Sequence, residues 1–168
     1  SNRIKVGYFS SYFRQHPVTM LSVNMLEYSD KENFETFAFH YGKNIQDEYR
    51  LRITSAFDHF IDVSGMLDKE IAQLALEKEI DIAIEFNGFM KDERIGILAH
   101  RPAPIQINYL AYPGTMGANF YDYIVADTIL IPEDQKINYS ENIIYMPNCY
   151  MPQDGTRQIS DKSITRQE

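Results

Sequence analysis

The chain has 168 residues, of which 44% are hydrophobic and 24% are charged, a composition typical of one folded domain and not of a disordered segment. Its 16 Lys and Arg residues against 24 Asp and Glu residues give a net charge of −8. This sign disfavours contact with the phosphates of nucleic acids or with anionic membranes, so we expect neither partner. The one cysteine, Cys149, has no intrachain partner, and the sequence contains no signal-peptide pattern and no apolar run of about 18 residues. We therefore expect a cytoplasmic protein.

Short apolar runs alternate with amphipathic stretches along the chain. The runs are rich in β-branched and aromatic residues and predict strands, and the stretches carry apolar residues at helical spacing and predict helices. In chain order we expect strand 4–9, helix 17–28, strand 34–39, helix 46–57, strand 60–63, helix 68–78, strand 81–86, helix 92–101 and strands 105–110, 123–126 and 143–146.

Three residues mark expected helix boundaries: Pro17 at a first helical position, Asp68 as an N-cap, and Pro102 as a stop. Regular alternation of strands and helices predicts parallel strands joined by right-handed crossovers. The sequence therefore predicts a doubly wound, mainly parallel α/β lobe over residues 3–152. The polar residues 153–168 predict a tail or linker.

In such a sheet, ligands bind beyond the carboxyl ends of the strands, which selects the loops 10–17, 87–91 and 111–117. His16 is the most informative residue in these loops. It precedes Pro17, which favours an extended backbone, so we expect it at the mouth of the first helix. An imidazole there can take or give a proton near neutral pH. A surface or capping role is the alternative that this pattern leaves open.

The remaining polar residues give weaker signals. We expect His59 to be structural, His40 to be structural or functional, and His100 to lie at a helix end. Glu85 interrupts an apolar strand and is expected to face the crossover helices or solvent at an edge. The spacing of histidine, cysteine and carboxylate residues predicts no zinc site, and the glycines form no nucleotide-binding fingerprint. The glycines in 112–117 bring backbone close to a ligand or form a tight strand exit.

Several longer motifs follow one another in a fixed order. They are residues 3–18 (RIKVGYFSSYFRQHPV), Asn87-Gly88-Phe89 with Arg94, residues 101–106 (RPAPIQ), 109–115 (YLAYPGT), 122–127 (DYIVAD) and 139–147 (YSENIIYMP). Together this set resembles the catalytic region of the O-linked N-acetylglucosamine transferases, including the SPINDLY-like proteins. The resemblance covers residues 3–152.

The resemblance implies an inverting, metal-independent glycosyltransferase of GT-B type, with an active site between two Rossmann-like lobes. It identifies this chain as the N-terminal lobe. A second lobe with most of the nucleotide contacts is expected after it, and tetratricopeptide repeats before it. The full protein is expected to move N-acetylglucosamine from a nucleotide sugar, UDP-GlcNAc, to Ser or Thr of a protein or peptide acceptor. No cofactor is expected, and the isolated lobe is expected to be inactive.

The resemblance also assigns site residues. His16 matches the active-site histidine of the His-Pro motif and would contact the acceptor hydroxyl or the donor. The other residues expected to bind substrate lie beside His16 or in the two neighbouring loops: Pro17, Val18, Phe89, Leu110, Ala111, Tyr112, Pro113 and Gly114.

Three positions depart from the family pattern. Tyr12 stands where the family usually has an aspartate, and a phenol cannot accept a proton in the same way at neutral pH. Ala111 replaces a glycine, and Met90 replaces a threonine. These departures leave two alternatives open. One is a non-catalytic recognition scaffold with a degenerate transferase fold, and the other is a transferase with a different donor or a non-protein acceptor.

Overall fold

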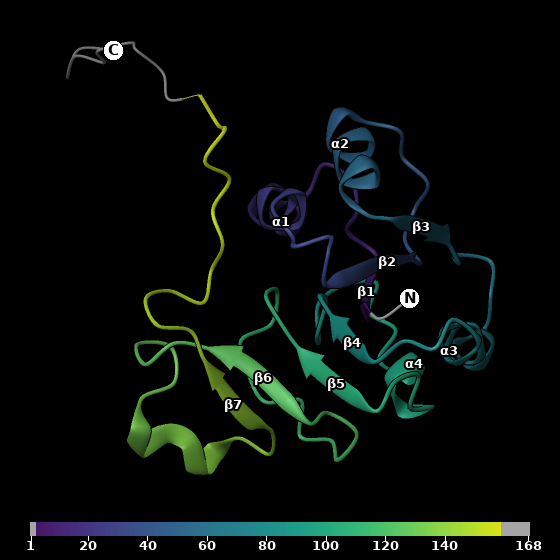
Figure 1. The fold of residues 1–168 in the computed structure, drawn as a ribbon. Coiled ribbons are helices and arrows are strands. Elements are labelled where there is room, and N and C mark those ends of the chain that lie inside the picture. The colour runs from purple at the N-terminus through teal and green to yellow at the C-terminus, as the bar shows by residue number, and fades with distance from the viewer. Residues whose placement is uncertain (1–2, 159–168) are drawn as a thin grey trace.

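The computed structural model describes residues 3–158, which form one seven-stranded sheet with helices on both faces (Figure 1). The elements are β1 (Ile4–Ser10), α1 (Pro17–Glu27), β2 (Phe34–His40), α2 (Glu48–Ala56), β3 (His59–Asp62), α3 (Asp68–Glu77), β4 (Ile82–Glu85), α4 (Gly96–Ala99), β5 (Ile105–Asn108), β6 (Tyr123–Ala126), η1 (Glu133–Asn138) and β7 (Asn142–Tyr145).

All strand pairs are parallel, and their order is β3-β2-β1-β4-β5-β6-β7. The chain winds outward from β1 in one direction through β2 and β3, and then in the other direction from β4 onward. The predicted doubly wound α/β lobe is confirmed. The winding direction changes between β1 and β4, which is where ligands bind in sheets of this kind.

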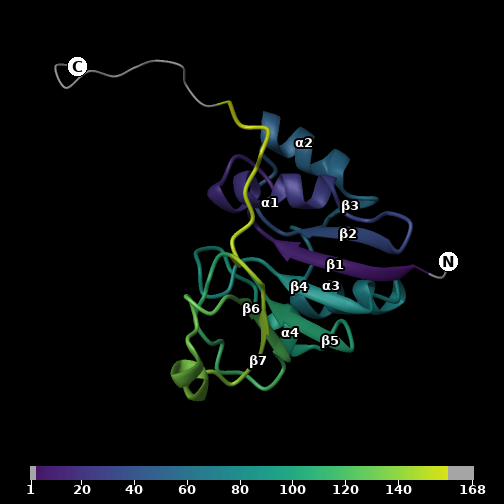
Figure 2. The ribbon, with the colours of Figure 1, turned by 60° about the vertical axis from the view of Figure 1, so that its left-hand side comes forward.

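Two helical layers cover the sheet, as Figures 1 and 2 show. Successive residues of a strand point to opposite faces. On β1, Tyr8 therefore packs with the residues of α1 and α2, while Phe9 packs on the α3 and α4 side, where its ring stacks on Phe39 at 4.6 Å. Within residues 3–158, no helix combines the length and the apolar character that crossing a membrane requires.

The fourth helix is much shorter than the predicted 92–101, and the chain is helical only over α4. Asp92 has a φ of 60°, a left-handed conformation that an α-helix cannot contain. Arg101, with a φ of 55°, is left-handed as well, so both end residues of the predicted helix are excluded from it, and the chain is helical only over Gly96–Ala99. Pro102 follows the helix, as expected.

The prediction that Asp68 caps α3 is wrong. Leu67 occupies the N-cap position, and its backbone N–H donates to the carboxylate of Glu70 at 2.8 Å. Asp68 lies in the first turn and accepts from Nε of Arg94 at 2.7 Å. The 3-10 helix η1 was not predicted, because it buries no residue and so produces no apolar pattern.

The carboxyl end of β4 carries a buried acid. Glu85 is 1% exposed and lies on the α3 and α4 side of the sheet, one of the two orientations that the sequence allowed. It accepts from the backbone N–H groups of Asn87, at 2.8 Å, and Gly88, and from the hydroxyl of Tyr41 at 3.0 Å. Burial raises the pKa of Glu85 to about 7, against the opposing effect of these three donors.

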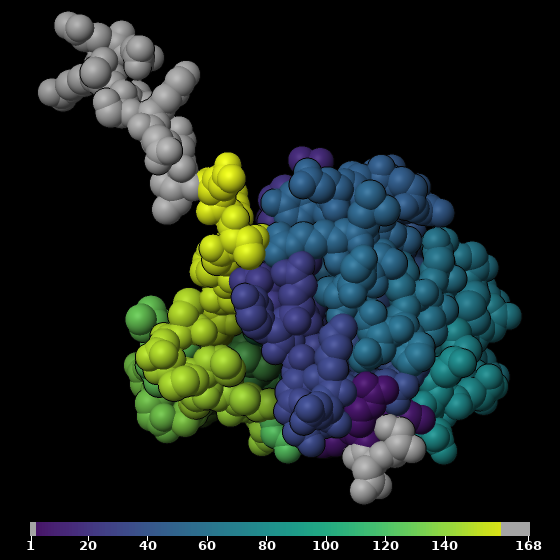
Figure 3. Space-filling model, turned by 45° about the horizontal axis from the view of Figure 1, so that its top comes forward, coloured from purple at the N-terminus to yellow at the C-terminus, as the bar shows by residue number. Residues whose placement is uncertain are grey.

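The segment after β7 returns across the α1 side of the lobe, where it is drawn in yellow in Figure 3. Asp154, with a side chain that is 1% exposed, pairs with Arg52 on α2. The N–H of Gly155 donates to the side chain of Asn24 on α1 at 3.2 Å. The predicted boundary at residue 152 stays a prediction, but contacts with the lobe continue through residue 155. Residues 159–168 of the predicted tail lie outside the described part of the chain.

We expect Asp154→Asn to lower the free energy of unfolding at neutral pH by about 1–3 kcal/mol, because it removes the charge that Arg52 binds. Arg52 keeps Glu27 as a partner, which limits the loss. Arg52 and Thr156 hold the pKa of Asp154 well below its usual range, so this stabilisation decreases as the pH falls below about 4. Urea unfolding at several pH values measures both effects, and the exposed Glu133→Gln is the control.

Glu85→Gln should change how stability depends on pH. Because the folded-state pKa of about 7 lies above the ordinary value for a glutamic acid, the contribution of Glu85 is complete at low pH and is lost as the pH rises through 7. Between about pH 4 and pH 8, we expect the unfolding free energy of the variant to rise relative to wild type by about 3 kcal/mol. A difference that stays constant with pH would contradict this assignment.

Candidate active site

Three loops meet at the carboxyl ends of β1, β4 and β5, because these strands are neighbours in the sheet. Asn87, which is fully buried, joins the first two loops. Its Oδ1 accepts from the hydroxyl of Ser10 at 2.9 Å, and its Nδ2 donates to the hydroxyl of Ser11 at 2.6 Å. The loop after β1 is therefore fixed to the loop after β4 by side-chain hydrogen bonds.

The loop after β4 packs directly on the loop after β5. Gly88 has a φ of 55°, and a Cβ atom at this position would lie 2.2 Å from Cβ of Tyr112, so only glycine fits. The ring of Phe89 meets that of Tyr112 nearly at right angles, with centroids 5.3 Å apart. Asn108, the last residue of β5, donates from Nδ2 to the carbonyls of Tyr112 and Gly114 at 3.1 and 3.2 Å.

The loop after β5 begins with a strained residue, and side chains from the segment just before β7 hold the loop in place. Leu110 has a φ of 89°, a conformation that costs a residue with a side chain about 1–3 kcal/mol. Glu141, which is buried, accepts from the N–H of Met116 at 2.6 Å and from the hydroxyl of Thr115 at 2.7 Å. The hydroxyl of Tyr139 donates to the carbonyl of Pro113 at 3.1 Å. These bonds keep the loop in the conformation that Leu110 resists.

His16 lies where the sequence predicts, as the N-cap of α1 with an extended backbone. Its Nδ1 accepts from the N–H of Val18 at 3.3 Å. Burial and the nearby guanidinium of Arg14 lower the pKa of His16 below its ordinary value. The ring is therefore neutral at pH 7, and because Nδ1 accepts a hydrogen bond, the proton is on Nε2. His16 offers the site a hydrogen-bond donor.

The predicted substrate-binding residues fall into two groups by exposure. Side chains that are exposed or half-buried in the three loops belong to Pro17, Phe89, Ala111, Tyr112 and Pro113, with Gly114 beside them. The side chains of Val18 and Leu110 are only 5% and 6% exposed and pack in the core. These two residues can therefore line the site chiefly through their backbones. Arg94 pairs with Asp68 and is not part of the loop cluster.

Sequence reasoning missed two of the three buried residues that hold the loops. Glu85, Asn108 and Glu141 each accept from or donate to backbone groups of the loops described above. Their common signal is a polar side chain at the end or the start of an apolar strand. That signal was noted only for Glu85.

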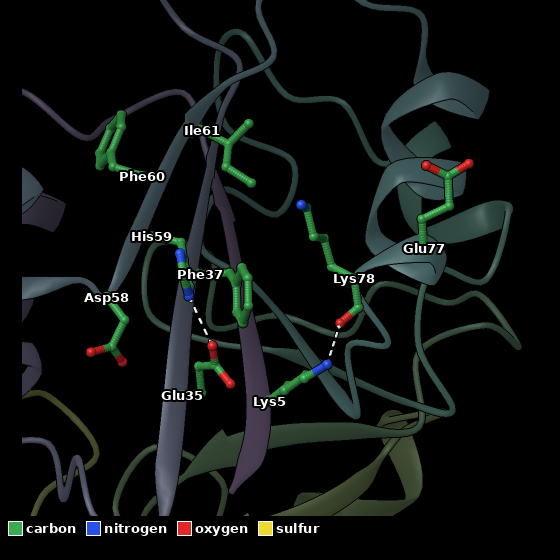
Figure 4. A pocket seen from close by; sticks show the side chains of 9 residues that line it. All are labelled: Lys5, Glu35, Phe37, Asp58, His59, Phe60, Ile61, Glu77 and Lys78. Atoms are coloured by element: carbon green, nitrogen blue, oxygen red, sulfur yellow. Dashed lines mark hydrogen bonds and ion pairs between the residues drawn. The ribbon is translucent and has the colours of Figure 1, made fainter. Parts of the chain in front are cut away.

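A hollow of about 580 Å³ lies at the opposite edge of the sheet, beside the amino ends of β1, β2 and β3 (Figure 4). Two polar contacts join residues that line it. Nε2 of His59 lies 2.8 Å from the carboxylate of Glu35, and Nζ of Lys5 donates to the carbonyl of Lys78 at 2.9 Å. This agrees with a structural role for His59.

His40 is fully buried at the end of β2, and Nε2 lies 3.3 Å from the carbonyl of Lys43. Burial lowers the pKa of His40 to about 4, so the ring stays neutral inside the lobe. Among residues 3–158, no three histidine, cysteine or carboxylate side chains are placed to hold a metal ion together.

Comparison with known proteins connects the chain to one family. The family model for glycosyl transferase family 41 matches residues 1–166. A probable UDP-N-acetylglucosamine–peptide N-acetylglucosaminyltransferase, SEC, of Arabidopsis thaliana is 38% identical over 159 residues, which are 95% of this chain and 16% of that protein. The Caenorhabditis elegans UDP-N-acetylglucosamine–peptide N-acetylglucosaminyltransferase is 32% identical over 98% of this chain and 15% of its own length.

The fold agrees with these matches. A solved structure of a mutant Thermobaculum terrenum O-GlcNAc transferase superposes with a TM-score of 0.86 at 28% identity, covering 90% of this chain and 29% of that one. The chain thus spans 15–16% of the length of the two relatives described above. From its sequence and its fold, the chain belongs to glycosyl transferase family 41.

Proposed function

We propose that this chain is the N-terminal lobe of an enzyme that transfers N-acetylglucosamine from UDP-GlcNAc to Ser or Thr hydroxyls of protein acceptors. Relatives that are 38% and 32% identical carry names that state this donor and a peptide acceptor. The observation that carries the proposal is the position of His16, whose imidazole lies at the carboxyl ends of the central strands, in the loop that Asn87 joins to the loop after β4. The single exposed cysteine, Cys149, supports a cytoplasmic location.

The proposed sugar transfer needs no reactant besides the donor and the acceptor. The hydroxyl oxygen of the acceptor forms a bond to C1 of the sugar on the face opposite the leaving group, which inverts the configuration at C1. The bond between C1 and the diphosphate oxygen breaks, and its electron pair leaves with UDP. The hydroxyl proton ends on the released diphosphate or in water. We propose no cofactor beyond the donor substrate, which stays a prediction.

In this mechanism His16 orients and does not deprotonate. Nδ1 is occupied by the N–H of Val18, and Nε2 carries the proton, so the ring has no free lone pair for the acceptor hydroxyl. Nε2–H can instead donate to an oxygen of the acceptor or the donor and hold it for attack. Fixed donors of this kind contribute to rate because they need no reorganisation during the reaction.

The described loops supply one wall of the proposed site. Phe89 is 49% exposed and Met90 is 41% exposed, and the half-buried ring of Tyr112 lies against Phe89. Apolar surface of this kind suits the flat face of a sugar ring. We propose that a second lobe supplies most of the contacts to uridine and diphosphate, so the isolated lobe is expected to be inactive.

We expect His16→Ala in the full-length enzyme to lower kcat/KM by roughly 100- to 1000-fold, which is the usual cost of removing one fixed donor from a reacting oxygen. His16 is only half-buried, so the variant should fold. The measurement is sugar transfer from UDP-GlcNAc to a panel of acceptor proteins. The matched control is His59→Ala, which removes an imidazole at the opposite edge of the sheet.

Unchanged transfer by His16→Ala would remove this residue from the mechanism. A full-length wild-type protein that binds acceptor peptides but no nucleotide sugar in calorimetry would instead support the non-catalytic scaffold. Transfer with a different nucleotide sugar, or to a non-protein acceptor, would preserve the chemistry and correct the substrate.

A further inference from the structure

The imidazole of His16 is covered on one face by another ring. Tyr12 stacks on it with ring centroids 3.8 Å apart and planes only 6° from parallel. Rings at this separation are in van der Waals contact over most of their area. Because Tyr12 is only 3% exposed, it has no room to follow a rotation of His16.

Tyr12 is anchored at both ends. Its hydroxyl donates to the carbonyl of Lys91, in the loop after β4. Its carbonyl accepts from the hydroxyl of Thr19, in the first turns of α1, and from the N–H of Arg14. The ring is thus fixed relative to the loop after β1, the start of α1 and the loop after β4.

Two independent contacts therefore determine the orientation of the imidazole of His16. The stack on Tyr12 sets the plane of the ring. The hydrogen bond from the N–H of Val18 to Nδ1 sets the rotation within that plane. The position of the Nε2 proton depends on both contacts.

We propose that Tyr12 is a positioning residue for His16, whose imidazole it holds in one plane through the ring stack. The orientation of the His16 ring by Tyr12 is argued from the stack and the hydrogen bonds alone. The effect of Tyr12 on the rate of sugar transfer rests on the proposed function.

The chemistry of a phenol suits this role better than a carboxylate would. Burial and the nearby Asp92 raise the pKa of Tyr12, so its hydroxyl keeps its proton and donates to Lys91. Tyr12 therefore places no negative charge beside the imidazole, and Arg14 adds a positive one. Both effects favour neutral His16, the form whose Nδ1 can accept from Val18. An aspartate at position 12 would favour the protonated ring.

The first test needs no variant. In NMR spectra of this chain, the ring current of Tyr12 should shift the Cε1 proton of His16 upfield of the same proton in the exposed His100. The side-chain nitrogen shifts should show the Nε2–H form at neutral pH. Absence of the upfield shift, or a mixture of the two neutral forms, would overturn the proposal.

The second test compares Tyr12→Phe, which keeps the stack, with Tyr12→Leu, which removes it. We expect Tyr12→Phe to retain the Nε2–H form of His16, while Tyr12→Leu gives a mixture of forms and raises the imidazole pKa toward its ordinary value. The internal control is His59, which stacks on Phe37 at 4.3 Å and should not respond. Unchanged His16 signals in a folded Tyr12→Leu protein would contradict the proposal.

In the full-length enzyme, Tyr12→Leu should lower kcat by roughly 10- to 100-fold with a smaller change in KM, while Tyr12→Phe stays close to wild type. If wild-type protein transfers no sugar, the proposed function fails, while the NMR results still decide whether Tyr12 orients His16. If transfer is normal in both variants, the positioning role fails and the proposed function stands.

Discussion

The candidate site depends on buried hydrogen bonds at the carboxyl ends of the strands. There, Glu85 and Asn87 bind backbone and side-chain groups of the loops that would otherwise be buried without partners. Asn87 connects the loop after β1 to the loop after β4 through Ser10 and Ser11. Glu85 closes the turn at Gly88, whose missing side chain allows Tyr112 to approach. Buried polar groups are costly unless they are paired, so these loops have few alternative conformations.

This rigidity determines what His16 can do. An imidazole on a mobile loop could exchange protons at either nitrogen, but here one nitrogen faces a backbone N–H and one ring face is covered by Tyr12. The positive charge of Arg14 further disfavours protonation. Tyr12, which stands where the family pattern has an aspartate, therefore contacts the histidine through its ring face and not through a charge.

The sheet was predictable because several of its strands are short, nearly continuous apolar runs, such as 123–126 and 143–146, as is typical of parallel sheets. The errors arose where contacts between distant residues override local pattern. Asp68 accepts a hydrogen bond from Arg94, which lies 26 residues later in the sequence, and does not cap α3. Glu141 reaches back 25 residues to hold the N–H of Met116. Position at a strand end could identify His16 as a candidate, but its tautomer depends on a geometry that only the fold reveals.

The two edges of the sheet differ in how their polar groups are satisfied, and this difference favours one of them as the reactive edge. At the amino edge, His59 and Lys5 are paired with groups of the same lobe. At the carboxyl edge, Oδ1 of Asn108 and Nε of Arg14 are buried without a hydrogen-bond partner among the described residues, and the side chains of His16, Phe89 and Tyr112 are exposed or half-buried. The carboxyl edge therefore presents side chains that the amino edge lacks, which is why the proposed site is placed there.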